Sequence, residues 1–265
     1  MLRWSINLFR VFGIQLAVHV SFLLLIAYYA WEGWQAGRLP GMLWSVALVL
    51  LFFVCVVLHE LGHSLTARRY GVRVPRILLM PIGGMAEFDR IPRQPSAELL
   101  ITLAGPAVNF LLAGLLFPLC WTALRGMLGD VAPAEYSLAD LGTQLLLANL
   151  IMGTFNLLPV FPMDGGRILR AMLALKLDYV RATFWAANIG KTLALLFALL
   201  AGLYYHHYLL AVLFLFIYSA GDAEYRQLLQ REQEARYWAE MALRVGQPGE
   251  SGAEPPPPLI IHGPN

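Results

Sequence analysis

Long apolar segments dominate this sequence and limit what it can fold into. Six of them approach the roughly 20 residues that an α-helix needs to cross the hydrocarbon core of a bilayer. Apolar residues make up 58% of the chain and charged residues only 14%, whereas a typical soluble domain has about 25% charged residues. So few charges cannot cover a water-soluble globule, and the sequence predicts an integral, multi-pass membrane protein. The six segments lie at residues 14–31, 42–63, 99–119, 141–161, 182–205 and 207–220.

The predicted fold is an all-α polytopic membrane protein, a six-transmembrane-helix bundle. One stretch interrupts it, because residues 72–90 contain Pro75, Pro81 and two successive glycines. These residues cannot form a regular helix, and we expect a short strand or re-entrant segment between helices 2 and 3. Polar residues return after Asp222. The expected divisions are an intramembrane core over residues 1–222, a cytosolic polar helix over 223–246 and a disordered Pro-rich tail over 247–265.

Basic residues alternate from loop to loop and orient the predicted bundle. They gather before the first segment, between the second and third, between the fourth and fifth (Arg167 and Arg170 among them) and after the sixth. The other loops hold only Arg38 and Arg125. Cytosolic loops carry such an excess, so we expect both termini in the cytosol, in the cytoplasmic (inner) membrane of a bacterium. No basic stretch alternates with aromatic residues, and nucleic acid is not an expected partner.

The strongest chemical signal is the HELGH sequence at residues 59–63, where the second segment ends. On a helix, positions i and i+4 share a face, so His59 and His63 can bind one metal ion. Glu60 projects beside that pair, where it can take a proton from a metal-activated water. Ionisable groups at membrane depth are costly and generally functional. We therefore expect metal binding rather than a chance occurrence of the motif.

The motif provides two ligands, whereas catalytic zinc usually has three protein ligands and a water. The candidates for the third are His19, Glu87 and Asp164. Glu87 lies among arginines in the irregular stretch, and His19, near the middle of the first segment, is expected to be a buried, hydrogen-bonded residue. Asp164 is favoured because the second and fourth segments both end on the cytosolic side, which brings their ends to similar depth. The alternative for Asp164 is a helix N-cap, since residues 165–175 can form a short helix.

Four motifs occur together in this chain. They are HELGH, the Gly-Pro-x-x-Asn sequence that ends at Asn109, the N-x-x-P-x-x-P-x-D-G-G run that begins at Asn156, and a glycine-rich stretch at residues 80–86. As a set they resemble the site-2 protease family, the intramembrane zinc metalloproteases of peptidase family M50. The resemblance covers about residues 13–222 and is to a compact type without a PDZ or CBS domain.

The resemblance implies one zinc ion (Zn2+) per chain, bound by His59, His63 and Asp164, with Glu60 as the catalytic acid and base and Asn156 lining the cleft to position substrate. It also implies hydrolysis of a peptide bond in or near the transmembrane segment of a single-pass membrane protein (regulated intramembrane proteolysis). The expected partners are that substrate, the lipid bilayer and a regulatory membrane protein. The alternative is a membrane metal-binding protein or metal transporter without protease activity, which would not require Glu60 beside the histidine pair.

Overall fold

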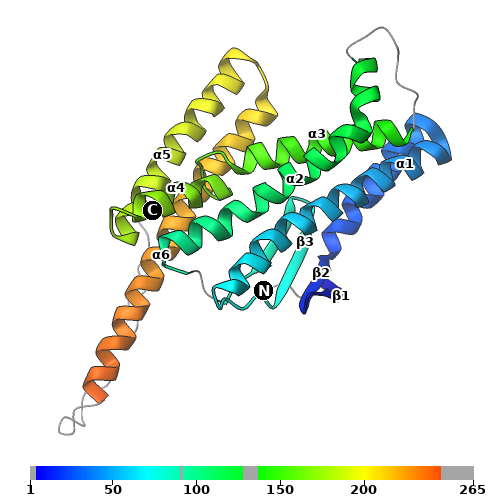
Figure 1. Cartoon of the computed structure of the whole chain (residues 1–265). Coiled ribbons are helices and arrows are strands. Elements are labelled where there is room, and N and C mark those ends of the chain that lie inside the picture. Colours follow the sequence, from blue (N-terminus) through cyan, green and yellow to red (C-terminus); the bar gives the residue numbers. More distant parts are fainter. Residues whose placement is uncertain (1–3, 90–91, 128–136, 246–265) are drawn as a thin grey trace. The chain divides into compact units, whose positions relative to one another are not determined.

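The computed structural model describes residues 4–89, 92–127 and 137–245, and most of them are helical (Figure 1). They form two compact units. The first comprises the residues up to 159 together with 163–177, and the second comprises 160–162 together with the residues from 178 onward. The tail predicted at 247–265 lies outside the described residues.

Helix α1 (Val20–Arg69) contains the first two predicted spans. Its 50 residues would measure about 75 Å as a straight helix, far more than the roughly 30 Å of a hydrocarbon core. The helical geometry breaks at Gly37 and at Arg38, whose φ is 54°, and Pro40 follows. A non-glycine residue at positive φ marks a sharp change of direction, so α1 consists of two limbs.

The two limbs of α1 pack against each other. The rings of Phe22 and Phe53 meet edge to face with centroids 4.5 Å apart. Near the turn the backbones approach so closely that a Cβ on Gly33 would lie 2.4 Å from the carbonyl oxygen of Gly41. The limbs therefore form an antiparallel hairpin that can cross a membrane twice.

Helices α2 (Pro95–Met127), α3 (Leu138–Asn156) and α4 (Asp164–Ala174) complete the helical part of the first unit. Helix α2 packs against α1, α3 and α4, and Figure 1 shows α1, α2 and α3 side by side. Five helices in the described part of the chain are long and apolar enough to span a membrane. Because α1 is a hairpin, they provide the six spans that the sequence predicts.

A four-stranded sheet lies beside this bundle, with strands β1 (Ser5–Val11), β2 (Ile14–His19), β3 (Arg76–Met80) and β4 (Gly83–Glu87). The order is β1-β2-β3-β4; the outer pairs are antiparallel, and β2 runs parallel to β3. The strands expected within residues 72–90 are confirmed as β3 and β4. Strand β4 forms one edge of the sheet.

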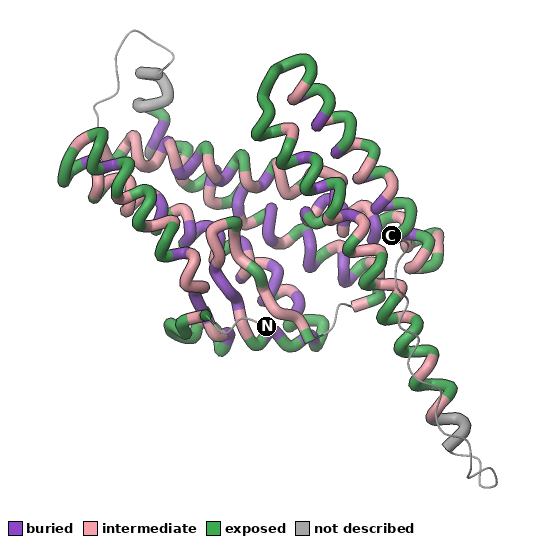
Figure 2. Tube along the Cα trace, turned by 180° about the vertical axis from the view of Figure 1, so that it is seen from behind, coloured by how far each residue is buried: buried purple, intermediate pink, exposed green. Residues whose placement is uncertain are grey.

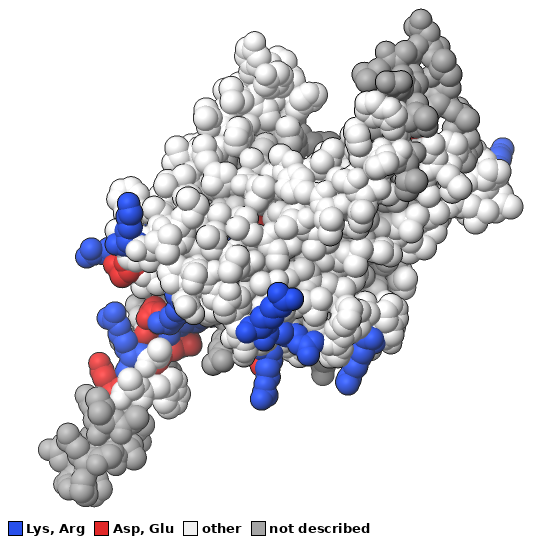
Figure 3. All heavy atoms as spheres, viewed as in Figure 1, with Lys and Arg blue, Asp and Glu red and all other residues white. Residues whose placement is uncertain are grey.

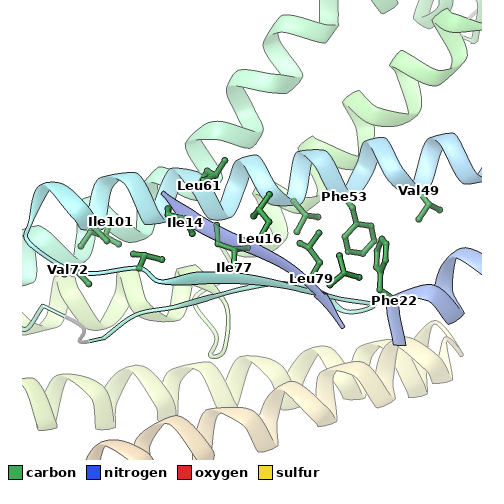
Figure 4. Close-up of a cluster of buried hydrophobic side chains, with 14 residues drawn as sticks. Ile14, Leu16, Phe22, Val49, Phe53, Leu61, Val72, Ile77, Leu79 and Ile101 are labelled. Carbon is green, nitrogen blue, oxygen red and sulfur yellow. The ribbon is translucent and has the colours of Figure 1, made fainter. Parts of the chain in front are cut away.

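The sheet and α1 share one apolar core (Figure 4). Strands β2 and β3 are buried almost continuously, as expected for central strands. Buried residues gather where the sheet meets the helices (Figure 2). The core side chains include Ile14, Leu16, Ile77 and Leu79 from the sheet and Val49, Phe53 and Leu61 from α1.

Strand β2 corrects the predicted start of the first span. The apolar run at Ile14 does not open a helix: the helix begins at Val20, and residues 14–19 form a strand. Phe12 and Gly13 have φ values of 50° and 78°, which reverses the chain after β1. The strand that follows, β2, lies between β1 and β3. Burial of its apolar side chains inside the protein, rather than contact with lipid, explains their hydrophobicity. His19 is accordingly not mid-helix but the N-cap of α1, where it accepts a hydrogen bond from the Ser21 backbone N–H.

The second unit contains α5 (Tyr179–Leu199), a π-helical turn η1 (Leu200–Tyr204) and α6 (Tyr208–Val245). Helices α5 and α6 pack together. Lys191, which lies inside the fifth span, pairs with Asp222 of α6 at 2.7 Å. Helix α6 continues without a break past residue 222, because no glycine or proline occurs between Gly221 and Val245, and the polar helix extends the apolar one.

Charged side chains avoid the apolar surface of the first unit (Figure 3). Lys and Arg gather beside the sheet, and the surface above them in that view carries almost none. Exposed arginines occur in β1 (Arg10), at the end of α1 (Arg68 and Arg69) and shortly before β3 (Arg73). An uncharged surface bordered by arginine fits an integral membrane protein.

Candidate metal centre

His59 and His63 lie side by side on the second limb of α1, one helical turn apart. Both are buried, with 5% and 7% of their surface exposed. Their rings meet nearly at right angles with centroids 4.7 Å apart, and their Nε2 atoms are 3.1 Å apart. The i, i+4 spacing therefore brings two imidazole nitrogens to one point, as the sequence predicts.

Asp164 joins this pair from another helix. It is the first residue of α4, and its Oδ2 lies 3.4 Å from His59 Nε2 and 3.2 Å from His63 Nε2. The N-cap of α4 is Met163, which makes no side-chain capping bond. The N-cap alternative for Asp164 is thus wrong, and its carboxylate is directed at the histidines.

The three atoms have the spacing of ligands around one small cation. In a tetrahedral zinc site with bonds of roughly 2.05 Å, neighbouring ligand atoms are about 3.3 Å apart; here the three separations are 3.1, 3.2 and 3.4 Å. Asp164 Oδ2 is buried, and no hydrogen bond of ordinary geometry reaches it from the described residues. Two imidazoles and a carboxylate are a common donor set for catalytic zinc, so these residues fit a zinc ion.

The neighbouring groups keep Asp164 in the form that binds a cation. Burial by itself would raise the pKa of the Asp164 carboxyl, but the two imidazoles outweigh it and hold the pKa below its ordinary value. The residue is therefore an ionised carboxylate at neutral pH.

Both imidazoles are oriented by hydrogen bonds that they donate to oxygen atoms of α2. His59 Nδ1 lies 2.5 Å from Asn109 Oδ1, and His63 Nδ1 lies 2.8 Å from the carbonyl oxygen of Ile101. Each acceptor requires the Nδ1 proton, which leaves the Nε2 lone pair free for a metal. Asn109 in turn donates to Asn149 Oδ1 on α3 at 2.9 Å. Asn109 and Asn149 thus connect α2 to α3, and Asn109 also orients a histidine.

Gly105 brings the backbone of α2 directly against the imidazoles. A Cβ at this position would lie 2.2 Å from His63 Nε2 and 2.8 Å from His59 Cε1. On α1, a Cβ on Gly62, next to His63, would lie 2.7 Å from the carbonyl oxygen of Ala104 on α2. The glycines therefore allow α1 and α2 to approach closely enough to form the centre.

Glu60 lies next to the pair and against strand β4. A Cβ on Gly84 would lie 2.7 Å from Glu60 Cγ and 3.3 Å from its Cδ. In the described part of the chain, no hydrogen bond or ion pair involves the Glu60 carboxylate. The carboxylate is therefore free to act on a water or a substrate.

Three other residues singled out in the sequence lie outside the cluster. Asn156 is the last residue of α3, and His19 hydrogen-bonds Ser21 Oγ at 2.6 Å. Glu87 ends β4 opposite Arg76 in the sheet. Among the described residues, only His59, His63 and Asp164 form a group that could hold a metal ion.

A buried ion pair close to the centre was not predicted from the sequence. Arg170, expected in a loop, is on α4, is only 2% exposed, and donates from Nε to Glu98 Oε1 of α2 at 2.8 Å. The available signal was helical spacing, because Arg170 follows the buried Gly166 by four residues and shares its face.

Comparisons with known proteins show the family to which the chain belongs. The model of peptidase family M50 matches residues 47–127 and 129–199, and the chain belongs to this family. It is 42% identical to a zinc metalloprotease of Methanocaldococcus jannaschii over 85% of this chain and 62% of that protein. It is also 29% identical to stage IV sporulation protein FB of Bacillus subtilis, over 80% of this chain and 67% of that protein.

A solved structure is similar as well. The site-2 protease from Methanocaldococcus jannaschii matches with a TM-score of 0.58 and 42% identity, over 84% of this chain and 95% of that chain. The present chain spans 62% of the archaeal relative's full length and 50% of a Mycobacterium tuberculosis relative that is 33% identical. The matched region is therefore about half to two thirds of the length of these relatives.

Proposed function

We propose that this chain is an intramembrane zinc metalloprotease that hydrolyses a peptide bond in or near the transmembrane segment of a single-pass membrane protein. The observation that carries the proposal is the convergence of His59, His63 and Asp164 on one point, with Glu60 beside it. Each of the three residues supplies one ligand atom, so one zinc ion is bound per chain. A metal-storage or transport site would not need an unpaired carboxylate next to the ligands.

The chemistry divides between the ion and the chain. A zinc ion at this centre supplies a Lewis acid that polarises the scissile carbonyl and makes a bound water more acidic. Glu60 takes the proton of the attacking water and returns it to the leaving amine. The hydrogen bonds that His59 and His63 donate to Asn109 Oδ1 and to the Ile101 carbonyl oxygen keep both imidazoles oriented throughout. Asn156 is proposed to position the substrate. It lies at the end of α3, eight residues before Asp164.

Strand β4 is proposed to hold the substrate. A transmembrane helix hides its peptide bonds in internal hydrogen bonds, so it must unwind before hydrolysis. Strand β4 is an edge strand, and Gly84 in it contacts Glu60. An extended peptide that pairs with β4 would therefore lie next to the catalytic carboxylate.

The proposed setting is the cytoplasmic membrane of a bacterium, with both termini in the cytosol. The arginines gathered beside the sheet support this orientation. A regulatory membrane protein is proposed to control substrate access. Cysteine labelling of intact cells at residues 10 and 73 would test the orientation, since impermeant reagents should leave both positions unlabelled.

The decisive test is cleavage of a co-expressed single-pass substrate. We expect Glu60→Gln to abolish cleavage and retain zinc, because glutamine keeps the shape of the side chain but cannot accept the proton. Glu32→Gln, at an exposed position of α1, is the control and should cleave normally. Cleavage by Glu60→Gln at the wild-type rate would refute the mechanism. Asp164→Asn should lower the zinc content of purified protein, and an unchanged content would remove Asp164 from the ligand set.

A further inference from the structure

Glu98 and Arg170 form an ion pair that is almost completely buried. Each residue is only 2% exposed. Arg170 donates from Nε to Glu98 Oε1 at 2.8 Å, and its terminal nitrogen contacts the same oxygen. Replacing a buried ion pair with apolar residues often leaves a protein equally stable or more stable. Stability alone is therefore a poor explanation for this pair, and its fixed geometry is a better one.

The pair connects α4 to α2, which lie side by side (Figure 1). Arg170 is six residues after Asp164 on α4, about 9 Å along the helix axis. A helix of only 11 residues can slide or rotate on its neighbour, whereas a guanidinium fixed on a carboxylate sets both its rotation and its height. The position of Arg170 thus determines where Asp164 lies.

Helix α2 already positions the other two ligands from the same face. Glu98, Ile101, Gly105 and Asn109 are all buried and follow one another at intervals of three or four residues, so they form one stripe along α2. The Ile101 carbonyl orients His63, Gly105 accommodates both rings, and Asn109 orients His59. At one end of the stripe, Glu98 contacts Arg170 of α4, the helix that carries the third ligand, Asp164.

We propose that Glu98 and Arg170 are positioning residues, which hold α4 so that Asp164 meets His59 and His63 at one metal ion. This rests on the proposed function, because it assumes zinc at that centre. The pair acts through geometry and not through its charge. Removing the Arg170 cation alone would, by electrostatics, favour a nearby divalent cation, whereas loss of positioning lowers zinc affinity. The two explanations therefore predict opposite changes.

The test measures zinc affinity of the full chain in detergent by chelator competition, together with the visible spectrum of the Co2+-substituted protein. We expect Arg170→Met to lower zinc affinity by about 10- to 100-fold, the usual effect of losing a group that orients a metal ligand, and to change the Co2+ bands. Lys176→Met, six residues further on and exposed, is the charge-matched control and should leave both unchanged. Unchanged or tighter zinc binding by Arg170→Met would overturn the proposal.

A double variant separates positioning from simple packing. Glu98→Leu/Arg170→Met removes both charges together, so it should unfold at or above the wild-type temperature when metal-free and still bind zinc about 10-fold or more weakly. Wild-type zinc affinity in the double variant would show that the pair only fills space, and would overturn the proposal. Failure of the wild type to bind zinc, or no loss in Asp164→Asn, would instead refute the proposed function itself.

Discussion

Gly105→Ala tests how closely the backbone of α2 must approach the histidines. The added Cβ would lie 2.2 Å from His63 Nε2, 2.4 Å from its Cε1 and 2.8 Å from His59 Cε1. Comfortable contacts of a methyl carbon begin near about 3.5 Å, so the overlap with Nε2 is about 3.5 − 2.2 = 1.3 Å. The ring cannot turn away freely, because its Nδ1 is bonded to the Ile101 carbonyl oxygen.

This overlap is large compared with what a metal site tolerates. Ligand distances in metal sites vary by only about 0.2 Å, so a shift of about 1 Å removes His63 from the ligand set. We expect zinc affinity to fall by more than about 100-fold, or about 2.7 kcal/mol. Overpacking should also cost about 1–3 kcal/mol of folding stability.

Zinc content by mass spectrometry and affinity by chelator competition provide the assay. The matched control is Gly114→Ala on the same helix, where a Cβ would meet nothing within 4 Å. This control should keep zinc and be as stable as the wild type or slightly more so, since alanine favours helix over glycine. If Gly105→Ala bound zinc as tightly as Gly114→Ala does, the inference that the α2 backbone must lie directly against the two imidazoles would be wrong.

Three other changes test separate parts of the centre. Asn109→Ala should lower zinc affinity by about 10- to 100-fold, because His59 loses its Nδ1 acceptor; Asn188→Ala on α5, whose side-chain amide donates to the Phe184 carbonyl oxygen of the same helix, should not change it. Gly84→Val should reduce substrate cleavage with zinc content unchanged, since its Cβ would displace Glu60. Normal cleavage by this variant would show that the contact between β4 and Glu60 does not matter for catalysis. Removing the metal with a chelator should abolish cleavage and lower the unfolding temperature, and zinc should restore both; activity that survives complete metal removal would exclude a metalloprotease.

Local patterns in the sequence are sufficient to predict the histidine pair and the number of spans, but not where the first span begins. An i, i+4 pair on a helix meets at one point whatever surrounds it, so HELGH predicts the positions of His59 and His63 directly. Asp164 requires one further step, because its depth follows from the alternation of spans and loops. The hairpin in α1 is also predictable, since two apolar segments are separated by a break that includes Pro40.

Contacts between distant segments explain what the sequence does not predict. Residues 14–19 begin an apolar segment, and they become a central strand only because they pair with β3, about 60 residues later, as well as with β1. Arg170 resembles a loop cation until α4 packs on α2 and buries it against Glu98. In both cases the partner lies far away in the chain, so local periodicity contains no information about the contact.

Charge balance gives the centre a further reason to bind a divalent cation. When Nδ1 donates and Nε2 binds a metal ion, His59 and His63 contribute no charge. Glu60 and Asp164 bring two negative charges into the helical bundle of a chain with few charged residues, where unpaired charge is costly. A zinc ion at the cluster brings the sum to zero, as Arg170 does for Glu98. Zinc should therefore stabilise the folded chain as well as take part in catalysis, and this is why chelation is expected to affect the unfolding temperature and the activity together.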